Sequence, residues 1–97
     1  MSVVKAHKGD IGRQFKLDAG EDITTATLLQ IKYKKPDDTT GVWTAAVSDT
    51  TYAVYTTQFI ADLDQVGKWK IQLYVEMAGA KVHGPVAEFH VYKRITD

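Results

Sequence analysis

The chain has 97 residues, and its 12 basic and 12 acidic side chains give a formal net charge of zero. It therefore lacks the basic excess that phosphate contacts impose on most nucleic-acid-binding proteins. Cysteine is absent, which excludes disulfides, thiolate nucleophiles and cysteine-ligated metals. The length predicts one domain, residues 1–97, without a signal peptide or membrane span, so we expect neither a nucleic acid nor a membrane as partner.

The N-terminal third predicts short strands separated by turns. Residues 3–6 (VVKA) are expected to pair at a sheet edge, and residues 14–19 (QFKLDA) to form a strand with Phe15 and Leu17 facing inward. Residues 22–26 (DITTA) are expected to form a short helical turn or bend.

Four longer segments alternate apolar and polar side chains, which is typical of strands with one buried face. They are TLLQIKYKK (27–35), VWTAAV (42–47), KWKIQLYVE (68–76) and VAEFHVYK (86–93). A further β-rich segment, YAVYTT (52–57), has apolar groups in both phases.

Turn residues lie between these segments. KKPDDTTG (34–41) has hairpin chemistry, SDTT (48–51) predicts a tight turn, and Gly79 predicts the turn before the last strand. Pro85 is expected to start that strand. About seven short strands at regular spacing indicate an all-β fold, an antiparallel sandwich of the immunoglobulin-like kind.

The approach to the strand at 68–76 carries the most specific signal. Asp64, Gly67 and Trp69 precede the core position Ile71 with the spacing of the E–F corner in immunoglobulin-like domains. Gly67 is expected to adopt a backbone conformation closed to other residues. The indole of Trp69 is expected to close the core and to bond an upstream carbonyl. Trp43 resembles the strand C tryptophan of the same fold.

The stretches GDIG (9–12), KPD (35–37) and DQVGKW (64–69) give the chain a layout similar to the immunoglobulin-like N-terminal module of phage baseplate upper proteins. This resemblance implies a non-enzymatic structural or accessory protein of the bacteriophage virion, folded in the host cytoplasm. It would dock on other virion proteins of the tail, baseplate or neck, or decorate the capsid, through a sheet face or an edge strand.

Catalytic and cofactor chemistry finds no support in the residue pattern. Ser2 and Ser48 lie outside any nucleophile elbow, so no catalytic residue is predicted. His7, His83 and His90 lack zinc-ligand spacing and are interpreted as surface histidines. We therefore predict no enzyme activity, no cofactor and no metal site.

Asp62 and Asp64 offer oxygens that could contribute to a calcium site, but calcium needs six to eight ligands and only remote helpers exist. We expect these carboxylates to bond to the backbone of their own loop instead.

Lysines gather at one predicted strand end. Lys32, Lys34 and Lys35 form it, and Lys68 and Lys70 are expected nearby. They could attract an acidic partner, or form a solvated face that prevents edge-to-edge aggregation.

Two tyrosines, Tyr74 and Tyr92, are predicted to face away from the core. Exposed tyrosines are enriched at interfaces, so they join Lys32 and Lys34 as candidate interface residues, and a homo-oligomer is one possible outcome. If their strands are neighbours, the two rings could form one patch. The alternative function is an adhesion module that stacks a host-surface glycan on Trp43, Trp69 or exposed tyrosines. Both tryptophans lie in the apolar phase, which argues against that platform.

Overall fold

The computed structural model describes residues 5–95. Its elements in chain order are β1 (Lys5–His7), β2 (Gln14–Asp18), β3 (Leu28–Lys34), β4 (Thr40–Thr44), β5 (Ala46–Asp49), β6 (Tyr52–Thr56), the 3-10 helix η1 (Ile60–Leu63), β7 (Gly67–Met77) and β8 (Ala80–Tyr92). Two residues of the predicted edge segment 3–6 lie outside the described part of the chain. Its remainder belongs to β1, which pairs with β8 in parallel at the edge of a sheet.

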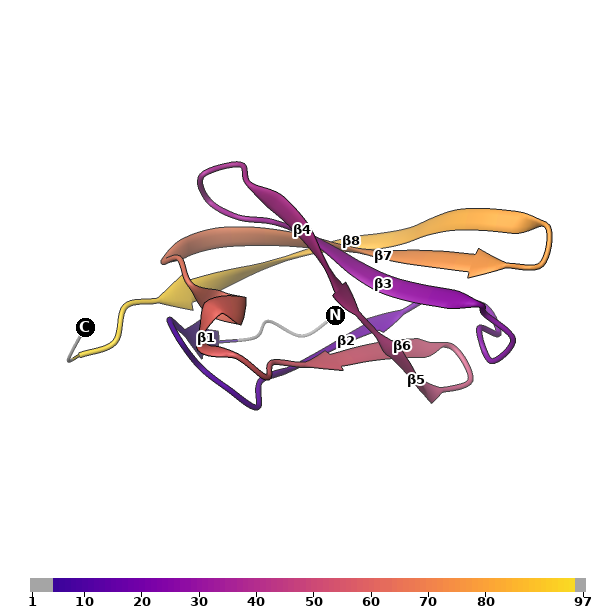
Figure 1. The fold of residues 1–97 in the computed structure, drawn as a ribbon, viewed down its shortest axis with the longest axis horizontal. Coiled ribbons are helices and arrows are strands. Elements are labelled where there is room, and N and C mark those ends of the chain that lie inside the picture. Colours follow the sequence, from indigo (N-terminus) through magenta and orange to yellow (C-terminus); the bar gives the residue numbers. More distant parts are fainter. Residues whose placement is uncertain (1–4, 96–97) are drawn as a thin grey trace.

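The strands form two facing sheets (Figure 1). One has five strands in the order β1-β8-β7-β3-β4, and the other has three in the order β2-β6-β5. All strand pairs except β1–β8 are antiparallel. The predicted all-β, immunoglobulin-like sandwich is therefore confirmed, with eight strands in the described residues instead of about seven.

The core forms because one phase of each long strand faces the opposite sheet. Along β7, Trp69, Ile71, Leu73 and Val75 are buried while the residues between them are at least partly exposed. The opposite sheet contributes Phe15, Leu17, Ala53 and Tyr55 from β2 and β6. The other buried apolar residues of the core are Ala6, Ile23, Leu29, Ile31, Trp43, Leu63, Phe89 and Val91. The inward positions predicted from alternation at Phe15 and Leu17 are confirmed.

The predicted single strand over 42–47 is wrong, because the chain changes sheets at Ala45. The Ala45 amide still donates to the Leu29 carbonyl at 3.0 Å, which ends the contact with β3. The next residue, Ala46, already pairs with Val54 of β6. β4 and β5 are consequently edge strands of different sheets. Trp43 of β4 is buried, but all residues of β5 are exposed, Val47 included, so the apolar phase does not continue as a buried face beyond Ala45.

Pro85 does not begin a strand as predicted, because β8 runs through it. The β7–β8 register shifts here: Gln72 pairs with Val86, but Tyr74 pairs with His83. Two residues of β8 thus oppose Leu73, which is a β-bulge. A bulge tolerates proline because one residue in it need not donate an N–H to the ladder.

Candidate functional site

The predicted corner is present and is structural. The Trp69 side chain is fully buried, and its Nε1–H donates to the Gln65 carbonyl at 3.0 Å, as a buried indole requires. Gly67 has a φ of +134°. Asp64 receives Lys35 Nζ at 2.9 and 3.0 Å, and this hydrogen bond raises the pKa of Lys35 despite the opposing effect of burial. The corner therefore ties the turn after β3 to the start of β7.

Asp62 bonds to its own loop, as expected, whereas Asp64 bonds to the Lys35 side chain. Asp62 Oδ2 accepts the backbone N–H groups of Gln58 and Phe59 at 2.9 and 3.1 Å and the Tyr55 hydroxyl at 2.6 Å. Burial, followed by the bond to Asp62, raises the pKa of Tyr55 from 10.0 to about 12.

This pKa shift predicts a loss of stability at high pH. The folded state holds Tyr55 protonated, so its contribution is complete below pH 10 and disappears as the pH rises from 10 to about 12. We expect the free energy of unfolding, measured in urea, to fall more steeply over this range in the wild type than in Tyr55→Phe. Equal slopes would contradict the assignment, since lysine deprotonation affects both proteins alike.

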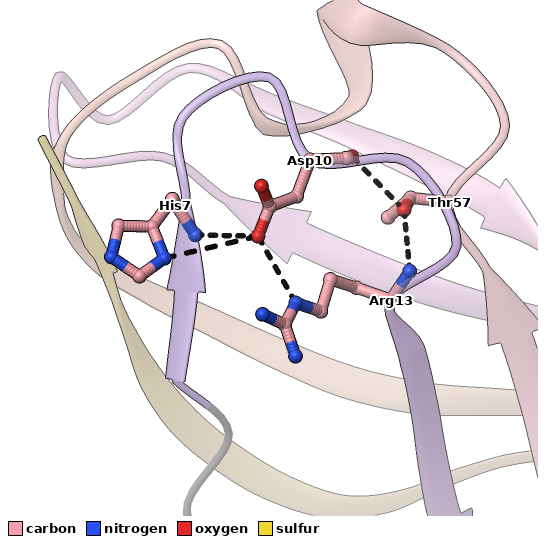
Figure 2. Close-up of polar contacts among 4 residues, drawn as sticks. All are labelled: His7, Asp10, Arg13 and Thr57. Carbon is pink, nitrogen blue, oxygen red and sulfur yellow. Dashed lines mark hydrogen bonds and ion pairs between the residues drawn. The ribbon is translucent and has the colours of Figure 1, made fainter. Parts of the chain in front are cut away.

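The loop between β1 and β2 is held by a polar network, shown in Figure 2. Asp10 Oδ2 accepts the His7 amide at 2.9 Å and Arg13 Nε at 3.0 Å. The Thr57 hydroxyl donates to the Asp10 carbonyl at 3.1 Å and accepts the Arg13 amide at 3.0 Å. Burial acts to raise the pKa of Asp10, but these bonds and the Arg13 charge lower it overall.

The three histidines are exposed, as predicted. Over residues 5–95, no group of three or more His, Cys, Asp or Glu side chains is arranged to hold a metal ion. Nor does this part of the chain contain a helix long and apolar enough to cross a membrane.

A groove of about 540 Å³ crosses the outer face of the five-stranded sheet. Its lining comes from β3, β4, β7 and β8 and consists of Lys32, Tyr33, Lys34, Thr40, Gly41, Val42, Lys70, Ile71, Gln72 and Val86. We call it the lysine groove, after Lys32, Lys34 and Lys70. Val42 and Val86 give it apolar walls, with exposed fractions of 49% and 61%.

The lysines of the groove are only partly neutralised. Lys34 and Lys70 lie directly opposite each other in the β3–β7 register. Lys34 Nζ is 3.6 Å from Asp38, but the Lys70 side chain has no hydrogen bond or ion pair with any described residue. Beside the groove, Lys68 lies 3.5 Å from Glu88. The sequence-based expectation that Lys68 and Lys70 lie near the lysines of β3 is confirmed.

Tyr74 lies at one side of this groove. Lys32 Nζ is 4.2 Å from the centre of the Tyr74 ring and 3.4 Å from His83 Nε2. The Tyr74 hydroxyl donates to Glu76 at 2.8 Å, and this bond raises the pKa of Tyr74. Tyr74 is therefore half-buried among polar neighbours, and Lys32 is held against it.

Tyr92 lies far from Tyr74, although β7 and β8 are neighbours. Tyr92 follows Val91, which pairs with Gly67, whereas Tyr74 pairs with His83. Tyr92 therefore lies opposite position 66, eight residues from Tyr74, and at about 3.3 Å per residue the two backbone positions are about 26 Å apart along the sheet. The single tyrosine patch is therefore excluded, and Tyr92, 41% exposed, packs beside His90 with ring centres 4.6 Å apart.

The glycan platform loses its two best residues. Trp43 is 5% exposed and Trp69 is not exposed at all. Trp43 stacks on Phe15 and Tyr55 at 5.3 and 5.0 Å between ring centres, so its ring is packed within the core. Neither indole can stack on a sugar.

Comparison with known proteins gives a fold and no family. No family model matches the chain, and no curated protein matches it. Among solved structures, the chain is similar to the crystal structure of CopC from Methylosinus trichosporium OB3b, with a TM-score of 0.61 and 18% identity over 93% of this chain and 85% of that one. At this identity the likeness establishes the β-sandwich fold alone.

The comparison corrects the predicted function. The fold is shared with CopC from Methylosinus trichosporium OB3b and so does not indicate a virion component, and the predicted role in the tail, baseplate, neck or capsid decoration is withdrawn. The GDIG, KPD and DQVGKW stretches that suggested it are short turn motifs. Such motifs report local backbone geometry, which unrelated proteins share, because function resides in sites and not in folds.

Proposed function

We propose that this domain is a non-catalytic binding module that holds an anionic partner in the lysine groove. The observation that carries the proposal is the direct opposition of Lys34 and Lys70 on neighbouring strands. Like charges opposite each other destabilise a sheet. A negatively charged partner bound at these lysines would offset their repulsion and would itself be attracted to both.

Protection of a sheet edge does not account for these lysines. Lysine commonly blocks aggregation on edge strands. Here β3 and β7 are interior strands of the five-stranded sheet, flanked by β4 on one side and β8 on the other. The position of Lys34 and Lys70 on interior strands therefore favours binding over edge protection.

The chemistry of the groove suits binding better than catalysis. Its charged side chains are cationic, its walls are the exposed Val42 and Val86, and the carboxylates nearest to its lysines, Asp38 and Glu88, are paired with Lys34 and Lys68. A nucleophile activated by an adjacent base is missing from this lining. Mixed cationic and apolar surface fits a partner that carries carboxylates beside aliphatic groups.

A copper-handling role, which the likeness to CopC raises, finds no ligand cluster among the described residues of this chain. Copper sites need imidazole, thiolate or thioether ligands in a cluster. The chain has no cysteine, and its three histidines do not gather with acids into such a group over residues 5–95.

The proposal predicts that removing two groove charges weakens anion binding. We expect Lys34→Gln with Lys70→Gln to bind soluble poly-L-glutamate about 3–10-fold more weakly, since each exposed ion pair is worth up to about 1 kcal/mol. The matched control is Lys81→Gln with Lys93→Gln, which removes the same charge from exposed positions outside the groove. Titration calorimetry at low salt measures both.

The two double variants separate site binding from general charge attraction. An equal loss in both would show that poly-L-glutamate responds only to net charge, and would refute the groove as the site. The groove variant is expected to unfold at the wild-type urea concentration or slightly above it, because a repulsive pair is removed.

A further inference from the structure

We infer that the anionic partner is a second copy of this chain, whose acidic end occupies the lysine groove so that copies associate head to tail. This inference rests on the proposed binding role of the groove. It adds the identity of the partner and the geometry of the contact.

The acidic end is formed by segments that are distant in sequence. The Ala19 amide donates to Thr51 at 2.7 Å and the Ile23 amide to Thr50 at 2.9 Å, so the loop after β2 packs against the β5–β6 turn. Four exposed carboxylates gather there: Asp18, Glu21, Asp22 and Asp49.

These carboxylates outnumber their cations. Lys16 lies 3.8 Å from Asp49, and no ion pair with a described residue involves Asp18, Glu21 or Asp22. Asp18 and Asp22 accept local bonds from Gly20 and Thr24 instead, which hold the loop without removing its charge. The acidic end thus contains four carboxylates and one lysine, which is an excess of negative charge. The groove and its flank contain four lysines (32, 34, 68 and 70) and two carboxylates (Asp38 and Glu88), which is an excess of positive charge.

The two surfaces cannot meet within one molecule. The groove lies near the β3–β4 turn, on the outer face of the larger sheet, whereas the acidic end lies at the other end of β3, beside the turn of the smaller sheet (Figure 1). The molecule is 47 Å long and 22–24 Å across. An attraction between such separated surfaces is satisfied only between copies.

The overall charge permits this contact. With 12 basic and 12 acidic residues, two copies experience no net repulsion, so the local patches decide the approach. Because the surfaces differ, the contact is heterologous, and it builds a ring or a filament instead of a twofold dimer.

The first measurement is the mass in solution by light scattering over a range of protein concentrations. Exposed charges are screened within about 10 Å at about 0.1 M salt and within about 3 Å at about 1 M. We therefore expect the average mass to rise with concentration at low salt and to return to that of the monomer at high salt.

Charge reversal identifies the two surfaces. Lys34→Glu with Lys70→Glu should make the protein monomeric, and so should Glu21→Lys with Asp22→Lys. A one-to-one mixture of the two variants should associate again. The groove of the first variant is now negative and the end of the second is now positive, so the two surfaces attract. Lys81→Glu with Lys93→Glu is the control, since it makes the same change in net charge outside both surfaces and should be affected least. Circular dichroism checks that each variant is folded.

Each outcome decides the inference. A wild-type protein that stays monomeric at low salt overturns head-to-tail association. So does association that survives reversal of the groove, or a mixture that fails to associate. The proposed function is judged separately: if poly-L-glutamate binding still depends on Lys34 and Lys70, the groove remains a binding site for another anionic partner, and if it does not, both ideas fall.

Discussion

Trp69→Ala is expected to lower the free energy of unfolding by about 3–5 kcal/mol, the usual cost of truncating a buried aromatic side chain. The Trp69 ring is fully buried and packs within 5.7–6.3 Å, centre to centre, of Tyr33, Phe89 and Trp43. The variant leaves a cavity in the core between the two sheets and an unpaired carbonyl at Gln65. Urea unfolding followed by far-ultraviolet circular dichroism measures the loss.

Two further substitutions divide this effect into its parts. Trp69→Phe keeps most of the ring but removes the N–H that Gln65 accepts, so we expect a cost of about 1–3 kcal/mol from the unsatisfied carbonyl. Tyr92→Ala removes an exposed ring and should change stability by less than about 0.5 kcal/mol. If Trp69→Ala costs no more than Tyr92→Ala, the indole does not close the core.

Gly67→Val is expected to cost about 2–6 kcal/mol, because backbone strain and a steric clash add together. Gly67 has a φ of +134°, where a side chain adds strain of about 1–3 kcal/mol. A Cβ at this position would also lie 2.8 Å from Pro36 Cγ, so the hairpin turn would have to move. Overpacking of this kind typically costs a further ~1–3 kcal/mol. The unfolding midpoint in urea reports the sum.

Gly79→Val is the matched control, because Gly79 also has a positive φ, +76°, but a Cβ there would meet no non-neighbouring atom within 4 Å among the described residues. Its cost should therefore contain the strain alone. Adding Pro36→Ala should recover part of the loss in Gly67→Val and none of the loss in Gly79→Val. A Gly67→Val protein as stable as the wild type would contradict the corner geometry.

Local features of the corner could be predicted from the amino-acid sequence. The spacing of Gly67 and Trp69 ahead of β7 predicted the backbone conformation and the indole hydrogen bond, because both depend on residues fewer than five positions apart. The alternation along β3 and β7 predicted their buried faces for the same reason. The pleat places successive side chains on opposite sides whichever strand lies next to them.

The candidate site could be predicted only in part. The sequence indicated that lysines of β3 and β7 gather, but it did not show that Lys34 faces Lys70 or that both strands are interior. The groove walls offered one weak signal. Val42 and Val86 are apolar residues out of phase with the core-facing positions of their strands, and therefore point to solvent. Whether such residues meet across four strands depends on strand order.

The sequence by itself determined the strand faces, the turns and the corner, since these follow from steric and hydrogen-bonding preferences over a few neighbouring residues. Tertiary structure alone decided the break at Ala45, the bulge at Pro85, the pairing of Lys34 with Lys70 and the gathering of Asp18, Glu21, Asp22 and Asp49. Each of these requires a choice among partners far apart in the chain. The packing of two sheets around one core decides these partners, and they cannot be predicted from the alternation of apolar and polar residues.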